Sequence, residues 1–201
     1  MTNSIEDLIQ HLEDPAFQSQ ETGRLFHPTY IYTYLVEDEY EMQEQLQLIL
    51  QRLKRPTHFL DCLLINLFDE LVAYLKSNRL FETTVFNEIL KREEKDPIGA
   101  QKWIMDKVDD ERFIEYITLK IKTHFDGRNN KAVYLLINGV GEAFPYLRGS
   151  DFLKRIESLS KNFKVILFYP GEYRDNYYNL FGQLKTDNIY RANLLDRKSV
   201  V

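Results

Sequence analysis

Hydrophobic positions along the chain alternate between two periods, one typical of β-strands and one typical of amphipathic helices. The strand-like segments are short runs of aromatic and branched apolar residues, each followed by a stretch with helical spacing. Such alternation, with connections of a dozen or more residues, predicts an α/β fold in which helices cover a mostly parallel sheet. The segments expected as strands are 29–36, 58–65, 132–137, 164–169 and 189–195.

The helix-like segments carry their apolar residues on one face. Two of them also have a clear start signal. Asn66 is placed to cap the helix that follows it, and Asp96 followed by Pro97 has the pattern of a cap and a first helical residue. The segments expected as helices are 38–55, 66–77, 83–91, the stretch after Pro97 that carries Trp103 and Val108, 110–124 and 146–158.

Three further stretches are expected to lack regular strand structure. The run NGVGEAFP at 138–145 reads as a loop, and Pro170-Gly171 is expected to end the strand that begins at Lys164. The segment 177–184 is expected to be helical or turn-like.

The chain predicts one domain, because 201 residues exceed the usual domain length only slightly and no repeat or low-complexity linker divides them. We expect a single α/β domain, 1–201, built as a three-layer sandwich around a largely buried sheet of about five strands. The sheet would be RecA/AAA-like, or Rossmann-like without a phosphate loop. Three parts stand apart from it: an N-terminal helix or arm at 1–23, a helical insert at 83–124 and a loose tail at 197–201.

Composition narrows the classes of protein. Lys and Arg number 26 against 31 Asp and Glu, a net charge of −5, which argues against a surface that mainly binds nucleic acid. The single cysteine, Cys62, permits no internal disulfide and no cysteine-based zinc cage. No apolar run approaches the roughly 20 residues of a membrane span, and residues 1–13 are acidic and amphipathic, unlike a signal peptide. We therefore expect a cytoplasmic protein without membrane association.

In an open parallel sheet, a ligand-binding or catalytic site is expected beyond the carboxyl ends of the strands, which all lie at the same edge of the sheet. Polar or glycine-rich groups follow four of the expected strands here. They are the acids at 37–39, Asn66, the run NGVGE at 138–142 and the run PGEY at 170–173. Their convergence would follow from the fold and is no sign of catalysis by itself.

Gly139-Val140-Gly141 invites comparison with a phosphate loop, but the match is incomplete. A dinucleotide fingerprint needs a third glycine where Phe144 stands, and a Walker A loop needs a lysine after glycine, which occurs nowhere in the chain. The alternative is that the glycines permit a tight turn with positive φ. The strand before them also resembles a Walker B strand, but Asn138 follows it directly and the acid, Glu142, comes four residues later.

The other potentially reactive side chains are better explained by structural roles than by catalysis. Glu142 and Arg148 could form an ion pair, and Arg148 could equally reach Asp151, but surface pairs contribute only about 0–1 kcal/mol. Cys62 lies in an apolar strand and reads as a buried, inert thiol. Asp61 beside it needs a helix N-terminus or a basic partner if it is buried. We expect no metal site, because no histidine has metal-ligand spacing; the four are His11, His27, His58 and His124.

The tyrosine-rich segment 173–190 leaves three interpretations open. It contains Tyr177 and Tyr178 and is flanked by Arg174 and Arg191. Tyr and Arg together are typical of protein interfaces, and also of stacking platforms for single-stranded nucleic acid. The third interpretation is internal packing of a helix layer on the sheet.

The last third of the chain contains the run VYLLINGVGEAFPYLRGSDFLKRI at 133–156, in which an apolar strand is followed by Gly-Val-Gly-Glu and by Phe-Pro-Tyr-Leu-Arg before a helix. This run resembles the BrxB family of BREX phage-exclusion systems. The weaker family-like stretches are VILFYPGEY at 165–173, LFG at 180–182, DNIYRA at 187–192, and the upstream segments 30–36 and 63–75. The resemblance thus covers most of the chain from about residue 24. Two positions depart from the family pattern: Gly149 stands where Ser or His is usual, and Ile189 replaces the first Tyr of Asn-Tyr-Tyr-Arg.

This resemblance implies a small adaptor in an antiviral defence system that methylates host DNA and blocks phage replication. It implies no enzymatic activity and no cofactor, with a PglZ-like protein as partner, other BREX components as further partners and no direct binding to DNA. Residues expected at a partner-binding site are Glu142, Phe144, Tyr146, Arg148, Glu172, Tyr173, Arg174, Tyr177, Tyr190 and Arg191.

Two alternatives compete with the adaptor. One is a nucleotide-binding or Mg²⁺-dependent phosphate-hydrolysing enzyme with a degenerate site, using Glu142 and Glu172 for the metal. The other is a nucleic-acid-binding module that uses Arg174, Tyr177, Tyr178 and Arg191.

Overall fold

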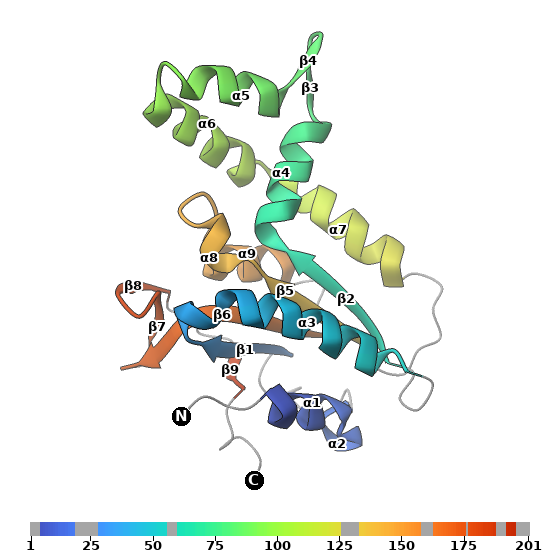
Figure 1. Cartoon of the computed structure of the whole chain (residues 1–201). Coiled ribbons are helices and arrows are strands. Elements are labelled where there is room, and N and C mark those ends of the chain that lie inside the picture. Colours follow the sequence, from blue (N-terminus) through green and yellow to red (C-terminus); the bar gives the residue numbers. More distant parts are fainter. Residues whose placement is uncertain are drawn as a thin grey trace.

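The computed structural model shows an α/β protein in three layers, with a sheet between two groups of helices (Figure 1). This is the fold class that the sequence predicts. The structure describes residues 5–18, 28–55, 60–125, 133–157, 163–175, 177–187 and 192–195.

Five parallel strands form the middle layer of the described chain, in the order β2-β5-β6-β1-β9. Counted along the chain, the first strand therefore lies between the fourth and the fifth. This order differs from the 3-2-1-4-5-6 order of the dinucleotide-binding fold. The strands are β1 (Thr29–Tyr34), β2 (Asp61–Asn66), β5 (Val133–Asn138), β6 (Lys164–Arg174) and β9 (Asn193–Leu194).

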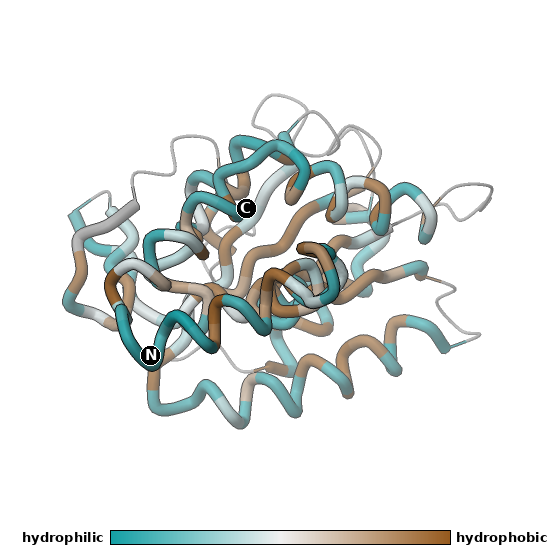
Figure 2. Tube along the Cα trace, turned by 90° about the horizontal axis from the view of Figure 1, so that it is seen from above, coloured by the Kyte–Doolittle hydropathy of each residue, from teal (hydrophilic) through white to brown (hydrophobic). Residues whose placement is uncertain are grey.

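Both faces of the sheet are buried, and strand alternation divides the apolar side chains into two cores. In β1, Tyr30 and Tyr32 pack in one core and Ile31 in the other; in β5, Leu136 and Leu135 divide in the same way. Figure 2 shows the hydrophobic strands in the middle of the molecule, with the helices alternating hydrophobic and hydrophilic positions around them.

The first core is covered by α1 (Ile5–Glu13), α2 (Pro15–Gln18) and α3 (Glu39–Leu53). Arg52 on α3 links α3 to α1 within this layer. Its Nε donates to Glu13 at 2.8 Å and its Nη1 to Glu6 at 3.0 Å.

The second core is covered by helices from the middle of the chain. Arg155 links two of them, because its guanidinium donates to the backbone carbonyls of Val108, Asp109 and Asp110, where α6 ends. The helices that contribute buried side chains to this core are α4 (Leu67–Ser77), α5 (Val85–Glu93), α6 (Pro97–Asp109), α7 (Glu111–Phe125), α8 (Val140–Ala143) and α9 (Gly149–Ile156).

The segment expected as a helical insert, 83–124, divides into two parts. α5 and α6 lie away from the sheet, beside the short hairpin of β3 (Arg79–Leu80) and β4 (Thr83–Thr84), whereas α7 returns along the edge strand β2 (Figure 1). The expected caps are present. The side chain of Asn66 accepts from two backbone amides of α4, and Asp96 Oδ1 accepts from Gly99 N at 2.9 Å.

Two expectations for the C-terminal part were wrong. β6 does not end at Pro170 but continues to Arg174, and 177–184, expected to be helical or turn-like, is mostly strand with a turn only at 181–183. It contains β7 (Tyr177–Leu180), a turn and the start of β8 (Leu184–Asp187), which extend the sheet as an antiparallel hairpin. Proline is tolerated in β6 because it lacks only the donor; the Pro170 carbonyl accepts from Phe181 N at 2.9 Å.

Smaller differences concern element ends. The expected loop 138–145 contains the one-turn helix α8, and α9 begins at Gly149, three residues later than expected, after the cis Phe144-Pro145 bond. The expected strand start at His58, the residues 188–191 and the tail 197–201 lie outside the described residues.

Candidate functional site

Polar side chains from five elements meet beyond the carboxyl ends of the parallel strands. We call this group the strand-end rim. Its members come from the ends of β1, β2 and β5, the first turns of α3, and α8, and they are Tyr34, Glu39, Gln43, Asn66, Asn138 and Glu142. Glu39, Asn66, Asn138 and Glu142 come from the sets expected to converge there.

A chain of hydrogen bonds links five of these residues, all except Asn138, across the rim. The Tyr34 hydroxyl donates to Glu39 Oε2 at 2.7 Å. Gln43 Nε2 bridges the two acids, donating to Glu39 Oε1 at 3.3 Å and to Glu142 Oε1 at 3.1 Å. Asn66 Nδ2 donates to Glu142 Oε2 at 3.0 Å, so both carboxylate oxygens of Glu142 accept from neutral amides.

Asn66 has one possible orientation in this network. Its Oδ1 accepts from Phe68 N at 2.9 Å and Asp69 N at 3.1 Å, which caps α4. Because the cap occupies the oxygen, the amide nitrogen faces Glu142. One asparagine thus starts a helix and orients an acid of the rim.

Asn138 is the least satisfied member of the rim. Its side chain is 5% exposed, and its Oδ1 has no hydrogen-bond partner among the described residues. Tyr134 and Leu136 of the same strand pack in the first core, which α1, α2 and α3 cover, and Asn138, two residues further, faces the same side. The rim therefore holds a buried acceptor in addition to its two carboxylates.

The glycine loop between β5 and α8 is closed by its neighbours. Gly139 has φ +74°, and a Cβ there would lie 2.3 Å from Asn66 Oδ1. A Cβ on Gly141 would lie 2.9 Å from the Phe181 ring. The tight-turn interpretation is correct for Gly139, while Gly141 permits close packing. With an acid at Glu142 and these contacts, the loop does not form a phosphate cradle like that of a P-loop.

The rim is electrostatically negative. Burial, the hydrogen bond to Glu39 and the charge of Glu142 raise the pKa of Tyr34 well above its usual value. Among the described residues, neither Glu39 nor Glu142 forms an ion pair. The rim can therefore accept hydrogen bonds or attract a cation, but it repels phosphate.

The residues expected at a partner site do not form one cluster. Glu142 lies in the rim, and Phe144 contacts the Phe181 ring edge-on at 6.3 Å. Tyr146 is half-buried against the second core, whereas Arg148 is exposed. The expected pairs of Arg148 with Glu142 or Asp151 were wrong for the described structure, since Gln43 and Asn66 bind Glu142, and Asp151 pairs with Lys154 at 3.5 Å.

The remaining expected residues lie on the C-terminal hairpin. Glu172 and Arg174 pair with each other on β6, and the Tyr173 ring lies tilted against the Tyr178 ring, with 4.8 Å between the ring centroids. Tyr177 is half-buried. Tyr190 and Arg191 lie outside the described residues. Tyr178 is buried against Tyr169, so this tyrosine does pack internally, although it lies on a strand and not on the expected helix.

Sequence reasoning missed Tyr34 and Gln43 as rim residues. Tyr34 ends its strand on the face that α3 covers, and Gln43 lies four residues after Glu39, one helical turn away. These spacings were visible in the sequence. The bond from Gln43 to Glu142 was not, because it joins residues 99 positions apart.

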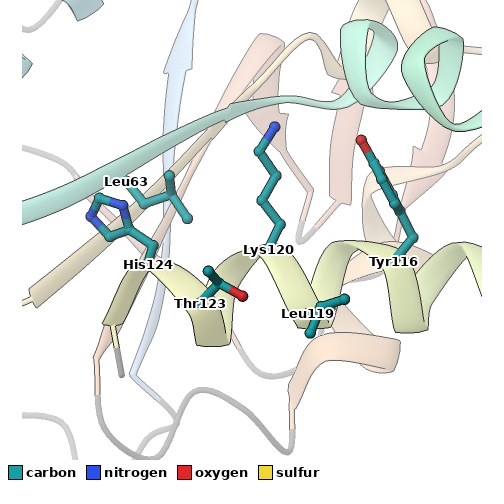
Figure 3. Close-up of a pocket in the computed structure, with 6 residues that line it drawn as sticks. All are labelled: Leu63, Tyr116, Leu119, Lys120, Thr123 and His124. Atoms are coloured by element: carbon teal, nitrogen blue, oxygen red, sulfur yellow. The ribbon is translucent and has the colours of Figure 1, made fainter. Parts of the chain in front are cut away.

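A second polar site lies between α7 and the edge strand β2. It is a cavity of about 550 Å³, and Figure 3 shows Tyr116, Lys120 and His124 pointing from α7 toward β2 and α4. These side chains contact buried acids. His124 is the basic partner expected for Asp61, because its Nε2 lies 2.9 Å from Asp61 Oδ1. Lys120 and Tyr116 both bind Glu70.

Other classes of site are not formed by the described residues. No three His, Cys, Asp or Glu side chains among them come together as a metal cluster. Cys62 is buried, as expected, and burial raises the pKa of its thiol to about 12. No helix in the described ranges is long and apolar enough to span a membrane.

These features define a class: an α/β protein with a central parallel sheet whose strand-end rim is joined by its own polar side chains. Comparison with known proteins specifies it further. The family model described as BREX protein BrxB matches residues 63–195. The chain belongs to the BrxB family and is a component of a BREX system.

Two curated relatives agree with the family model. A BREX protein BrxB from Bacillus cereus (strain H3081.97) is 24% identical over 196 residues, covering 96% of each chain. A BREX protein BrxB from Escherichia coli O9:H4 (strain HS) is 24% identical over 165 residues, covering 81% of this chain and 75% of the relative. No solved structure matches.

Proposed function

We propose that this protein is a non-catalytic interaction subunit of its BREX system and that it binds a PglZ-like protein of the same system. The observation that carries the proposal is that the protein's own side chains fill the strand-end rim. In open α/β sheets, ligands bind in the crevice beyond the carboxyl ends of the strands. Here Gln43 and Asn66 bind both oxygens of Glu142, and the loop after β5 is closed by Asn66 and Phe181.

The rim also counts against the two alternative functions. A nucleotide enzyme needs donors or cations that face the phosphates, whereas this rim presents Glu39 and Glu142. A nucleic-acid module needs a basic footprint, whereas the chain carries a net charge of −5. A protein partner places neither demand on the rim. The proposal places the protein in the cytoplasm, where the host DNA marked by such systems is found.

Co-expression with the PglZ-like protein of the same system tests the proposal. We expect the two proteins to elute together in size-exclusion chromatography at micromolar concentration. Calorimetry with ATP or GTP and Mg²⁺ serves as the control for the enzymatic alternative, and we expect no heat of binding. Separate elution of the two proteins would count against the adaptor role, and nucleotide turnover that is lost in Glu142→Gln would replace it with an enzymatic one.

A further inference from the structure

The segment between β1 and the first turn of α3, residues 35–41, combines exposed apolar side chains with acids. The Tyr40 side chain is 82% exposed, and Leu35 and Val36 are each more than a third exposed. Single exposed apolar residues are normal on a protein surface, but here three lie within six positions of the chain. We call these three residues the apolar patch.

Acids surround this apolar patch. Glu37, Asp38, Glu39 and Glu41 lie within the same segment, and Gln43 joins Glu39 to Glu142 on α8. None of the five acids forms an ion pair within the described part of the chain. The positive end of α3 accounts for Glu39 and Glu41 in its first turn, and Glu142 lies in the first turn of the four-residue helix α8.

Hydrogen-bond capacity points in the same direction as charge. The rim contains more hydrogen-bond acceptors than donors. The two oxygens of Glu142 accept only from neutral amide groups, and the buried Asn138 Oδ1 has no donor among the described residues. Lysine and arginine side chains are donors without acceptors, so they complement such a surface.

We propose that residues 35–41, together with Glu142, form a docking surface for a basic segment of a partner protein, with Tyr40 as the apolar anchor and the surrounding acids as the charged border. An apolar centre with a polar border is the usual anatomy of a protein interface, and tyrosine is enriched among the residues that dominate binding energy. The acids would speed association with a basic partner and discourage acidic ones, including nucleic acid. This inference rests on the proposed adaptor function and specifies where the partner binds.

The test uses the full chain and the PglZ-like protein in a surface-binding assay. The apolar variant is Val36→Ala with Tyr40→Ala, and its matched control is Phe81→Ala with Ile98→Ala, which truncates side chains 94% and 80% exposed on other elements. The charge variant is Glu37→Gln with Glu41→Gln, and its control is Glu93→Gln with Glu94→Gln at the exposed end of α5.

We expect the apolar variant to raise the dissociation constant by about tenfold or more, and its control to raise it by less than about twofold. The charge variant should slow association and reduce its dependence on salt, while its control should not. All four variants change exposed side chains, and their thermal unfolding should match that of the unchanged protein.

Each result decides between the surface and the adaptor role. If the unchanged protein binds and the apolar and charge variants of residues 35–41 bind equally well, the docking surface is wrong and the adaptor role stands. If the PglZ-like protein does not bind at all, its role as partner is wrong, and the same variants are tested against every other protein of the system. Binding to one of these that the variants weaken supports the surface; no such binding, or binding of only a second copy of this chain or of DNA, overturns it.

Discussion

Asn66 and Gly139 depend on each other at the residue scale. Asn66 caps α4 and donates to Glu142, and Gly139 leaves room for its side-chain oxygen while adopting φ +74°. An alanine at position 139 would meet two separate obstacles: the left-handed backbone, which disfavours any side chain with a Cβ, and the oxygen 2.3 Å away.

A double-mutant cycle separates these obstacles. We expect Gly139→Ala alone to lower the free energy of unfolding by about 2 kcal/mol or more, and Asn66→Ala alone by about 1–2 kcal/mol. In the Asn66→Ala background, Gly139→Ala should cost only about 1 kcal/mol, because the backbone strain remains and the clash is gone. Urea denaturation of the four proteins measures the coupling. Additive losses would show that Asn66 and Gly139 do not interact.

Also at the residue scale, the buried Lys164 makes the free energy of unfolding depend on pH. It is only 6% exposed, its amino group lies 4.3 Å from the centroid of the Phe17 ring, and it donates to the Phe17 carbonyl. Burial lowers the pKa of this amino group to about 8, from 10.5. Between these two values Lys164 binds more protons in the unfolded chain than in the folded one, so the contribution of this lysine to stability should rise with pH.

Unfolding measured from about pH 7.5 to about pH 9.5 tests this sign. We expect the unchanged protein to gain about 2 kcal/mol relative to Lys164→Met across the window. His11 does not interfere, because burial lowers its pKa further below the window. Tyr32 has its pKa raised to about 12 by burial, and tyrosines with raised pKa values reduce stability only above about pH 10, where unfolded tyrosine ionises. A constant difference between the two proteins would contradict the prediction.

At the scale of elements, α7 is held against α4 partly by charge. Glu70 on α4 is buried and binds Lys120 and Tyr116 of α7. Removing the cation leaves a buried carboxylate with one neutral donor from this helix, which costs more than losing a surface pair.

Lys120→Met should therefore lower the free energy of unfolding by about 1–3 kcal/mol. Lys122→Met is the matched control, because Lys122 is exposed on the same helix, and we expect a change within about 0.5 kcal/mol. Chemical denaturation of both variants gives the comparison. Equal effects would mean that the pair with Glu70 adds nothing specific.

At the scale of the whole molecule, the distribution of charge predicts weak binding to nucleic acid. The net charge is −5, and the strand-end rim is acidic. We expect no gel shift with single- or double-stranded DNA at micromolar protein. A shift that weakens steeply with salt would indicate a phosphate-binding surface elsewhere and would revive the nucleic-acid alternative.

Much of the architecture could be predicted from the sequence, for local reasons. Apolar runs without polar alternation, such as LLI within β5, identify strands buried on both faces, and the caps at Asn66 and Asp96 depend on residues two or three positions away. Where tertiary contacts compete with local signals, prediction failed. Pro170-Gly171 reads as a strand end, yet β6 continues because Pro170 pairs beside Tyr34 and its carbonyl bonds to Phe181.

The sequence by itself determined the class of fold, the group of residues that follow the strands, and the family. Each depends on short-range patterns: periodicity, capping and runs such as NGVGEAFP. Only the tertiary structure decided which of those residues meet. Bonds from Gln43 and Asn66 to Glu142 span 99 and 76 residues, and they exist because crossover connections bring α3, β2 and α8 to one edge of the sheet. Hydrogen bonds are local in space, so no pattern along the chain specifies their partners until the strand order is known.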